Sequence, residues 1–438
     1  MIGLYNSLLP AARLAARAWA WRDEKLSRSL ASRRGAESRL RAQASRLEGP
    51  LLWLHSSSVG EYEQARPIAA LWSAQQPDWH ILHTFTSPSG YDYARRLGEA
   101  PLVEYLVEDS PGRTGRVLDA LRPRAVVFVK WDVWPNLVVQ AHARGIPVAL
   151  VDATLRAASG RSRWPARALY RELYERMRLI SAVSERDAER FRRVAPAHPR
   201  IVVDGDTRFD QVMRRRQEAQ RVTLPDALDR TPGIFTCIAG STWEPDEALV
   251  LPEFAALTRL SEGKRVRLLL VPHEPSPARV ATIEAQCASL GLASVRLSEL
   301  ERAGREFQDR AGVVLVDRVG VLAELYARAD VAYVGGAFGA GVHNVMEPAI
   351  MGLPVFFGPR YRNAPEAEAL IEVGGAAVIA SPGDYERRLK GMLADPSTCR
   401  RMGDQARRYV EANLGASRRC VERIRDLMEK SPRAKEDS

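Results

Sequence analysis

VAYVGGAFGAGVHNVMEPAIMGLPVFFG, residues 331–358, carries a pattern of strand, glycine loop, helix and strand. Residues 331–334 form an apolar run typical of a short buried β-strand, and this run leads directly into a loop with four glycines. The segment Gly352-Leu353-Pro354 ends the helix that follows, and a second apolar strand is predicted at 355–357. Strand, loop, helix and strand in this order are typical of a parallel α/β sheet.

The helix within this stretch is predicted to begin near His343 and Asn344. Asn344 is a favoured N-cap residue and Glu347 follows three residues later, so the two can form a capping box. A glycine loop that leads into a helix N-terminus can present backbone N–H groups to a phosphate, and Glu347 could accept hydrogen bonds from a neighbouring sugar. A purely structural role stays open, in which Asn344 and Glu347 only cap the helix and the glycines only turn the chain.

Length, composition and charge restrict the class of protein. With 438 residues the chain is long enough for two domains, and 46% hydrophobic residues with 30 Gly and 27 Pro suit a globular α/β protein. The net charge of +10 favours anionic partners such as nucleic acid, anionic lipid or phosphorylated sugars. The four cysteines form no CxxC pair and no zinc spacing, which fits a reducing compartment.

Residues 1–50 differ from the rest of the chain. They begin with twelve uncharged residues, whereas a bilayer core requires about 20 apolar residues, and they carry ten Lys/Arg against four Asp/Glu. No small-residue cleavage site follows, so we expect no cleaved signal peptide. Trp19 and Trp21 before a basic run indicate a helix that lies in the membrane interface. The alternative is a soluble helix docked on the body of the protein.

From residue 51 onward, apolar strands alternate with helical segments. This alternation predicts a doubly wound parallel sheet, which binds ligands at the carboxyl ends of its strands. The expected strands are 51–55, 81–85, 125–129, 148–152 and 179–183. Candidate substrate-binding residues lie near those ends: His55, Ser56, Ser58, Gly60, Ser87, Lys130, Asp132 and Asn136.

A second series of strands and helices follows a polar, basic stretch that is broken by prolines. We therefore predict two Rossmann-like domains joined by a linker. The predicted parts are a membrane-associated basic segment (1–50), an N-terminal domain (51–200), the linker (201–232), a C-terminal domain (233–396), and C-terminal helices with a tail (397–438).

Several common active-site motifs do not occur. The sequence has no GxxxxGK[ST] and no GxSxG, and its glycine loop comes late in the chain without the downstream carboxylate of a dinucleotide site. These absences argue against a P-loop enzyme, a serine hydrolase of the α/β type and a dinucleotide-dependent enzyme.

Six motifs occur in one order along the chain: HSSSVGE (55–61), TFTSPSGYD (84–92), WPN (134–136), AGSTWEPDE (239–247), VPHEP (271–275) and GGAFGAGVHNVMEP (335–348). Together they resemble the Kdo transferases, which move 3-deoxy-D-manno-octulosonic acid (Kdo) from CMP-Kdo onto lipid A precursors. The resemblance covers essentially the whole chain. It implies a GT-B fold with two Rossmann-like domains facing a central cleft, and an inverting transfer that requires no metal or other cofactor. It also implies attachment to the cytoplasmic face of the inner membrane and no nucleic-acid partner, and leaves the oligomeric state open.

The resemblance assigns the nucleotide of CMP-Kdo to the second half of the chain, with Glu347 at the ribose. The first half would then hold the acceptor and the sugar acid. The residues assigned to the nucleotide are Gly240, Ser241, Thr242, Pro272, His273, Glu274, Gly335, Gly336, Gly341, Asn344 and Glu347.

An inverting transfer needs a base that deprotonates the attacking hydroxyl group. In the resembled family this base is a glutamate just after a basic N-terminal segment. Here the segment is SRRGAESRL, and Glu37 is its only carboxylate. Glu61 is the second candidate. A purely structural role for Glu37 is an exposed ion pair with a neighbouring arginine (Arg33, Arg34 or Arg41).

The chain departs from the family pattern at two loops. Lys130 and Asp132 stand where many members have an acidic pair, and His273 and Glu274 stand where many have Arg-His. Two other classes of function remain as alternatives. One is a different GT-B enzyme that uses a UDP-sugar, either a transferase or an epimerase. The other is a basic protein that binds the membrane surface without catalysis.

Overall fold

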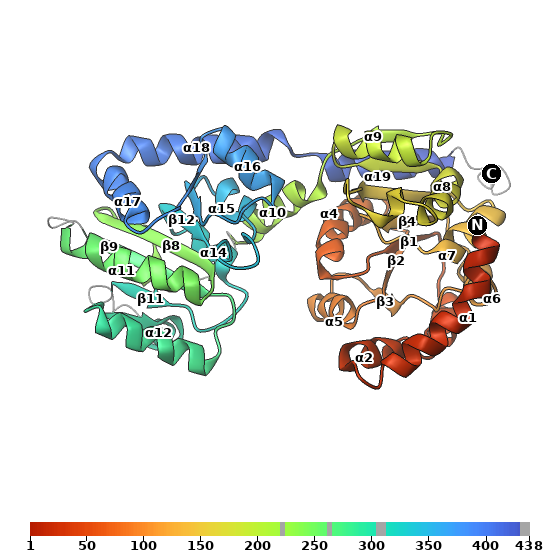
Figure 1. Cartoon of the computed structure of the whole chain (residues 1–438), viewed down its shortest axis with the longest axis horizontal. Coiled ribbons are helices and arrows are strands. Elements are labelled where there is room, and N and C mark those ends of the chain that lie inside the picture. The colour runs from red at the N-terminus through yellow and green to blue at the C-terminus, as the bar shows by residue number, and fades with distance from the viewer. Residues whose placement is uncertain (220–223, 261–264, 304–311, 430–438) are drawn as a thin grey trace. The chain divides into compact units, whose positions relative to one another are not determined.

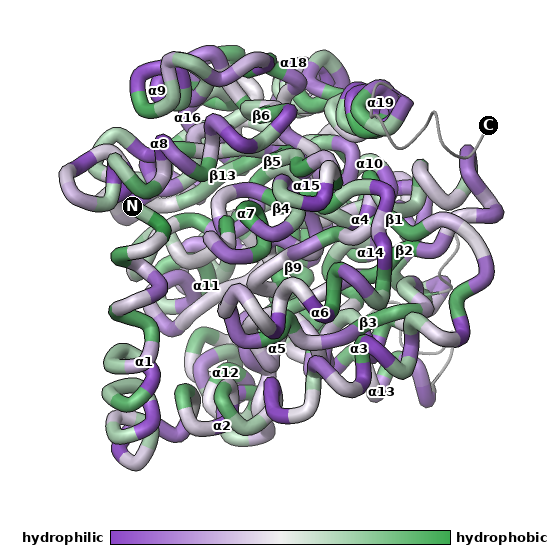
Figure 2. The backbone as a smooth tube through the Cα atoms, turned by 90° about the vertical axis from the view of Figure 1, so that its right-hand side faces the viewer, coloured by the Kyte–Doolittle hydropathy of each residue, from purple (hydrophilic) through white to green (hydrophobic). Residues whose placement is uncertain are grey.

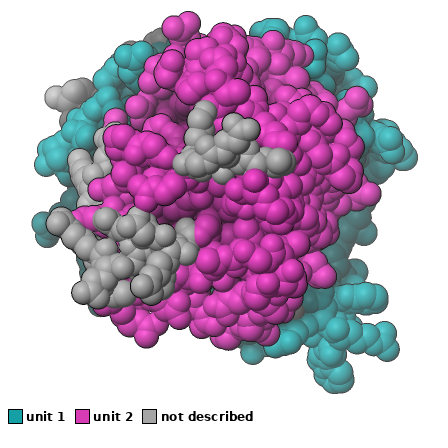
Figure 3. All heavy atoms as spheres, turned by 90° about the vertical axis from the view of Figure 1, so that its left-hand side faces the viewer, with its two compact units in different colours: residues 1–211, 414–438 teal, residues 212–413 magenta. Residues whose placement is uncertain are grey.

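The computed structural model describes residues 1–219, 224–260, 265–303 and 312–429 (Figure 1). The chain divides into two compact units, coloured separately in Figure 3. Unit 1 comprises residues 1–211 and 414–438, and unit 2 comprises residues 212–413.

Unit 1 is built on a parallel sheet with the order β3-β2-β1-β4-β5-β6-β7. Its strands are almost entirely apolar because helices cover both faces of the sheet. The order reverses between β1 and β4, which is the switch point where α/β sheets bind ligands. The strands are β1 (Leu51–His55), β2 (His80–Phe85), β3 (Leu102–Tyr105), β4 (Ala125–Val129), β5 (Val148–Ala153), β6 (Leu179–Ala182) and β7 (Ile201–Val203).

The helices of unit 1 form two layers. Alternate strand residues such as Trp53 and Phe128 pack against α3 and α6 to α9, whereas Leu54 and Val127 pack against α4, α5 and α19. The helices are α1 (Ile2–Trp19), α2 (Glu24–Ser32), α3 (Ala36–Ala44), α4 (Val59–Gln75), α5 (Pro88–Leu97), α6 (Pro111–Leu121), α7 (Pro135–Ala143), α8 (Ala166–Arg176), α9 (Glu185–Val194) and α19 (Ala416–Glu429), with a 3-10 turn η1 (Gly160–Ser162).

Unit 2 repeats this plan with a parallel sheet in the order β10-β11-β9-β8-β12-β13-β14. Its switch point lies between β8 and β12. The strands are β8 (Ile234–Thr242), β9 (Arg265–Pro272), β10 (Ser294–Arg296), β11 (Val313–Leu315), β12 (Val331–Val334), β13 (Val355–Phe357) and β14 (Ala376–Val378). The helices are α11 (Glu244–Leu260), α12 (Pro277–Ser289), α13 (Leu297–Ala303), α14 (Leu322–Tyr326), α15 (Met346–Ile350), α16 (Pro365–Glu372), α17 (Asp384–Ala394) and α18 (Pro396–Ala412), with a 3-10 turn η2 (Asp226–Leu228).

The boundaries of the two units differ from the predicted ones. The stretch 201–232, predicted as a linker, contains β7 and the helix α10 (Thr207–Ala219), which passes from unit 1 into unit 2. Its polar composition has a structural reason, because β7 is a partly exposed edge strand and α10 carries many charges. The predicted C-terminal helices also divide, since α18 belongs to unit 2 and α19 to unit 1. The predicted tail, 431–438, lies outside the described residues.

The N-terminal helix α1 lies along the outside of unit 1 (Figures 1 and 2). Two polar side chains of α1 contact the body of unit 1: the Tyr5 hydroxyl donates to Asp109 over 3.0 Å, and Asn6 accepts from Asn136 over 2.8 Å. The exposed side carries large apolar residues, which are Leu4, Leu8, Leu14 and Trp19. In the described part of the chain, no helix combines the length and the apolar character needed to cross a bilayer.

Candidate active site

A polar cluster lies at the switch point of unit 1. His55 ends β1 and Asp132 follows β4, and His55 Nε2 lies 3.6 Å from Asp132 Oδ2. The Ser57 hydroxyl donates to the same carboxylate oxygen, as does Trp134 Nε1 over 3.0 Å. Burial alone would raise the pKa of Asp132, but its contacts with His55, Ser57 and Trp134 lower that pKa to about 2. Asp132 is therefore ionised at neutral pH.

Glu61 lies in the first turn of α4 beside this cluster. The helix begins with a capping box, in which the Ser58 N–H donates to Glu61 Oε2 over 3.0 Å. Glu61 is only 3% exposed. Burial and the negative charge of Asp132 raise the pKa of Glu61 above its ordinary value. A carboxylate with a raised pKa is a stronger base, which suits proton abstraction.

Three residues at strand ends adopt a left-handed backbone conformation although they are not glycine. Lys130 follows β4 with φ 72°, Asp152 lies in β5 with φ 54°, and Ser241 lies in β8 with φ 54°. Such conformations cost about 1–3 kcal/mol each and gather at functional sites. Their positions agree with function at the carboxyl ends of both sheets.

The other substrate-binding candidates of unit 1 fall into two groups. Ser56, Ser58 and Gly60 lie on the loop and first turn between β1 and α4, and the Ser87 N–H donates to the Ser57 carbonyl over 3.0 Å. Asn136 lies elsewhere. Its side chain and backbone N–H donate to Asp109, and its side chain also donates to Asn6 of α1. Asn136 therefore anchors the N-terminal helix.

Glu37 lies in the first turn of α3 and is held by Arg116 of α6. Arg116 donates two hydrogen bonds to the Glu37 carboxylate, over 2.6 and 3.2 Å. This partner differs from the three arginines expected from the sequence. The hydrogen bonds from Arg116 lower the pKa of Glu37, which makes the carboxylate a weaker base.

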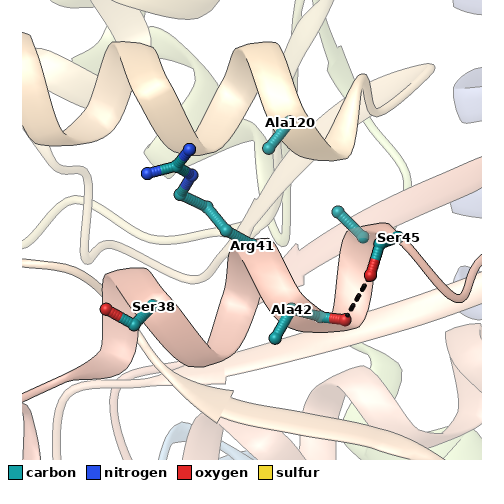
Figure 4. Close-up of a pocket in the computed structure, with 6 residues that line it drawn as sticks. Ser38, Arg41, Ala42, Ser45 and Ala120 are labelled. Atoms are coloured by element: carbon teal, nitrogen blue, oxygen red, sulfur yellow. Dashed lines mark hydrogen bonds between the residues drawn. The ribbon is translucent and has the colours of Figure 1, made fainter.

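A shallow hollow of about 540 Å³ lies between α3 and α6 (Figure 4). Its wall includes the Ser45 hydroxyl, which donates to the Ala42 carbonyl over 3.0 Å. Arg41 is the one charged residue among those that line it: Ser38, Arg41, Ala42, Ala44, Ser45 and Ala120. The hollow therefore offers few groups that could recognise a charged substrate.

The switch point of unit 2 carries a stack of three rings from three loops. The His273 and His343 rings lie parallel with centroids 4.5 Å apart, and the Trp243 ring lies 4.7 Å from His273. Trp243 Nε1 donates to His343 Nε2 over 3.0 Å. Burial and the neighbouring His273 lower the pKa of His343. His343 is therefore neutral at pH 7, as its role as acceptor from Trp243 requires.

The four glycine N–H groups of the loop after β12 donate within the protein, so they do not contribute to the predicted phosphate cradle. The Gly336 N–H donates to Asp246 over 2.9 Å, and the others donate to carbonyl groups within or beside the loop. The groups engaged in this way are the N–H groups of Gly335, Gly336, Gly339, Gly341 and His343. The glycines instead allow the backbone of the loop to lie close to the backbone of neighbouring segments. A Cβ at Gly335 would lie 2.7 Å from the Thr242 Cα atom.

The helix predicted to begin near His343 and Asn344 begins later. It spans only Met346–Ile350, with Val345 as its N-cap, so the predicted capping box does not form. The Asn344 side chain instead accepts from the Met346 N–H over 3.0 Å and donates to Glu347 over 3.1 Å. The Val342 N–H donates to the Arg360 carbonyl and the His343 N–H to the Gly335 carbonyl, both over 3.1 Å, so these residues belong to the loop rather than to the helix.

Glu347 also pairs with Arg215 of α10 within unit 2. The contacts of Arg215 and Asn344 with this carboxylate both involve Oε1. The other nucleotide-binding candidates lie at the ends of the neighbouring strands. Gly240, Ser241 and Thr242 end β8, whereas Pro272, His273 and Glu274 end and follow β9. Strand pairing of β8 with β9 and β12 therefore gathers all three predicted loops.

The comparisons with known proteins agree with this geometry. A family model described as 3-Deoxy-D-manno-octulosonic-acid transferase (kdotransferase) matches residues 28–211. A 3-deoxy-D-manno-octulosonic acid transferase of Bordetella pertussis is 31% identical over 94% of this chain and 95% of its own length. The chain belongs to the Kdo transferase family. A transferase of the same description from Haemophilus influenzae is 25% identical over 87% of this chain and 88% of its own length.

Two solved structures show the same fold as this Kdo transferase. UDP-GlcNAc 2-epimerase from Neisseria meningitidis aligns with TM-score 0.59 and 14% identity, covering 86% of this chain and all of the neighbour. MurG from Acinetobacter baumannii aligns with TM-score 0.53 and 14% identity, covering 86% and 99%. The predicted α/β fold of the GT-B type is confirmed.

Sequence reasoning missed several residues that organise the two sites. Ser57 lies inside a quoted motif, and its place between Ser56 and Ser58 was a usable signal. Asp246, which accepts from the Gly336 and Trp243 N–H groups, also lies inside a motif. Arg215 gave no signal, because it lies in the stretch predicted as a linker and is 132 positions from Glu347.

Proposed function

We propose that this Kdo transferase moves a Kdo residue from CMP-Kdo to a hydroxyl group of a lipid A precursor. The observation that supports this most directly is the placing of polar residues at both switch points. Unit 1 offers an ionised Asp132 and a Glu61 with a raised pKa. Unit 2 offers the ring stack and Glu347 beside a tightly packed glycine loop.

In the proposed reaction the acceptor oxygen attacks the anomeric carbon of Kdo. The bond from that carbon to the phosphate oxygen breaks, and CMP leaves with the electron pair. We assign the proton of the acceptor hydroxyl to Glu61, because its raised pKa makes it the stronger base. The Lys130 ammonium group offers a cation for the Kdo carboxylate. Glu37, the base implied by the family resemblance, is the alternative assignment.

In unit 2 the proposed donor contacts follow from the chemistry of each group. The flat surface of the ring stack suits the pyrimidine ring of CMP. The second carboxylate oxygen of Glu347, Oε2, can accept from a ribose hydroxyl, since the described contacts of this group use Oε1. Both contacts would orient CMP rather than take part in bond breaking.

A transfer assay tests this function. Purified protein is incubated with a tetraacylated lipid A precursor and CMP-Kdo generated in situ, and separately with UDP-sugars. We expect CMP release together with an increase in lipid mass by one or more Kdo residues. Turnover of a UDP-sugar without any use of CMP-Kdo would contradict the proposal and favour the alternative enzyme class.

We further propose that α1 binds this protein to the cytoplasmic face of the inner membrane. The exposed apolar side of the helix supports this, because apolar side chains gain about 1.5–3 kcal/mol each when fully buried. The variant Leu4→Gln/Leu8→Gln should cosediment with anionic vesicles at least about tenfold more weakly than wild type. Val319→Gln is a matched control, since Val319 is an apolar residue of unit 2 that is 75% exposed. Equal cosedimentation of all three proteins would contradict membrane binding by α1.

A further inference from the structure

The loop after β13 lies against the glycine loop of unit 2. β13 pairs with β12 in parallel, so both strands end at the same edge of the sheet. The Arg360 N–H donates to the Ala337 carbonyl over 2.9 Å, and the Val342 N–H donates to the Arg360 carbonyl over 3.1 Å. Asn363 adds a side-chain contact, since its Nδ2 donates to the Val342 carbonyl over 3.0 Å. The backbone at Arg360 is therefore fixed beside the glycine loop.

The side chain of Arg360 also reaches the glycine loop. Its Nη1 donates to the Gly339 carbonyl over 3.0 Å, and the residue is exposed. A guanidinium group carries several N–H donors in one plane, and the described contacts of this one use only Nη1. The other donors can therefore bind an incoming anion.

The other arginines at this edge of the sheet already have carboxylate partners. They follow β9, β11 and β13 or contact α15, and their pairs are Arg279 with Glu247, Arg318 with Glu301, Arg362 with Glu368, and Arg215 with Glu347. His343 beside the loop is neutral at pH 7, because burial and the neighbouring His273 lower its pKa. In this part of the described chain, the charge of Arg360 is therefore the one that no carboxylate compensates.

Carboxyl groups also border the glycine loop. Asp246 accepts from the Gly336 N–H over 2.9 Å and from the Tyr333 hydroxyl over 2.8 Å, and neither donor is a cation. Glu274 adds an exposed carboxyl group after β9. Carboxylates repel an anion, and the glycine N–H groups of the loop already donate within the protein. An anionic ligand at this loop therefore depends on the guanidinium group of Arg360.

We propose that Arg360 binds the phosphate group of the cytidine nucleotide donor. The inference rests on the proposed function and names the residue that neutralises the leaving group. The Kdo carboxylate, the other anionic group of the donor, has Lys130 as its cation in the proposed reaction. A guanidinium group suits the phosphate, because it can donate two parallel hydrogen bonds to two phosphate oxygens.

This contact also bears on the rate of transfer. When the bond from the anomeric carbon to the phosphate oxygen breaks, the electron pair stays on that oxygen and the phosphate gains negative charge. A cation that touches the phosphate therefore stabilises the transition state more than the bound donor. Arg360 should accordingly contribute to kcat as well as to donor affinity.

Binding of CMP and of cytidine, measured by calorimetry without lipid, tests the contact. Arg360→Gln removes the charge but keeps a side-chain N–H that can donate to the Gly339 carbonyl. We expect this variant to bind CMP roughly tenfold to hundredfold more weakly than wild type, the usual effect of losing a charge-assisted hydrogen bond. Cytidine should bind both proteins equally, because it lacks the phosphate. Equal thermal unfolding of both proteins would show that the loop is intact.

Arg362→Gln is the matched control. It removes the same charge from the same loop, at a residue that lies 3.9 Å from the carboxylate of Glu368. This variant should bind CMP as wild type does. Equal weakening of CMP binding in both variants would overturn the inference, because the effect would then come from the net charge of the loop.

The transfer reaction provides the second measurement. Arg360→Gln should raise the KM for CMP-Kdo and lower kcat, and Arg360→Lys should restore part of both because an ammonium group keeps the charge. Weaker binding of CMP and cytidine alike would overturn the inference, since Arg360 would then only shape the loop. Unchanged CMP binding with a raised KM for CMP-Kdo would also overturn it and assign Arg360 to the Kdo carboxylate. Failure of wild type to use CMP-Kdo would instead contradict the proposed function, and CMP binding would still test Arg360.

Discussion

Glu61→Gln should lower the rate of Kdo transfer by about 10²–10⁴-fold, the usual contribution of a general base. The substitution is nearly isosteric, and glutamine can also serve in the capping box with Ser58, so α4 should remain intact. The wild-type rate should rise with pH through the raised pKa of Glu61, because only the ionised carboxylate accepts a proton. The variant should lack this rise. Initial rates of CMP release between pH 4 and 8 measure both effects.

The matched control for this prediction is Glu37→Gln, which tests the other candidate base. Since Glu37 is engaged with Arg116 and its pKa is lowered, we expect this variant to keep its rate within about threefold of wild type. A large loss in Glu37→Gln with little change in Glu61→Gln would reverse the assignment of the base. Such a result would leave the conclusions about the fold and the proposed donor site unchanged.

Gly335→Ala should abolish use of the donor and destabilise unit 2. A Cβ atom at this position would lie 2.7 Å from the Thr242 Cα atom and 2.9 Å from the Ser241 carbonyl carbon. These are backbone atoms at the end of the neighbouring strand, and they cannot move without separating β8 from β12. Overpacking of this kind costs about 1–3 kcal/mol. Thermal unfolding and CMP-Kdo turnover together measure the loss.

Gly339→Ala provides the control within the same loop. The nearest atom to a Cβ at Gly339 is the Gly336 carbonyl oxygen at 3.6 Å, an ordinary van der Waals distance. Gly339 also does not have the left-handed backbone conformation of Gly336 and Gly341. This variant should therefore retain its stability and its turnover. Equal stability and equal turnover of the two alanine variants would contradict a requirement for close backbone contact at Gly335.

The inner strands of both sheets were predictable because buried parallel strands are near-continuous apolar runs. β12 and β13 have the predicted limits, Val331–Val334 and Val355–Phe357. The edge strands β3, β7, β10 and β14 were all missed, because they have only three or four residues and most of them are partly exposed. The start of α15 was misplaced because Asn344 and Glu347 satisfy a capping pattern that the packed glycine loop overrides.

Residues of the candidate site could be predicted only where they lie at strand ends within a sequence motif. The carboxyl ends of parallel strands meet at one edge of a sheet. This rule predicted that polar groups would gather there, and it pointed to His55, Asp132 and the three loops of unit 2. The Glu37–Arg116 and Glu347–Arg215 pairs join residues 79 and 132 positions apart. The local pattern of a sequence does not indicate partners so far apart. For the same reason it did not indicate that the glycine N–H groups donate to other groups of the protein.

The division of unit 1 between the two ends of the chain has a consequence for synthesis on the ribosome. Helix α19 packs Cys420, Val421 and Ile424 against one face of the sheet of unit 1. The ribosome makes residues 212–413 after the sheet of unit 1 and before α19. Unit 2 can therefore fold while unit 1 still exposes an apolar face. Native burial of this face must wait until α19 has been translated. Premature termination before α19 would therefore damage the first-made unit rather than the last-made one.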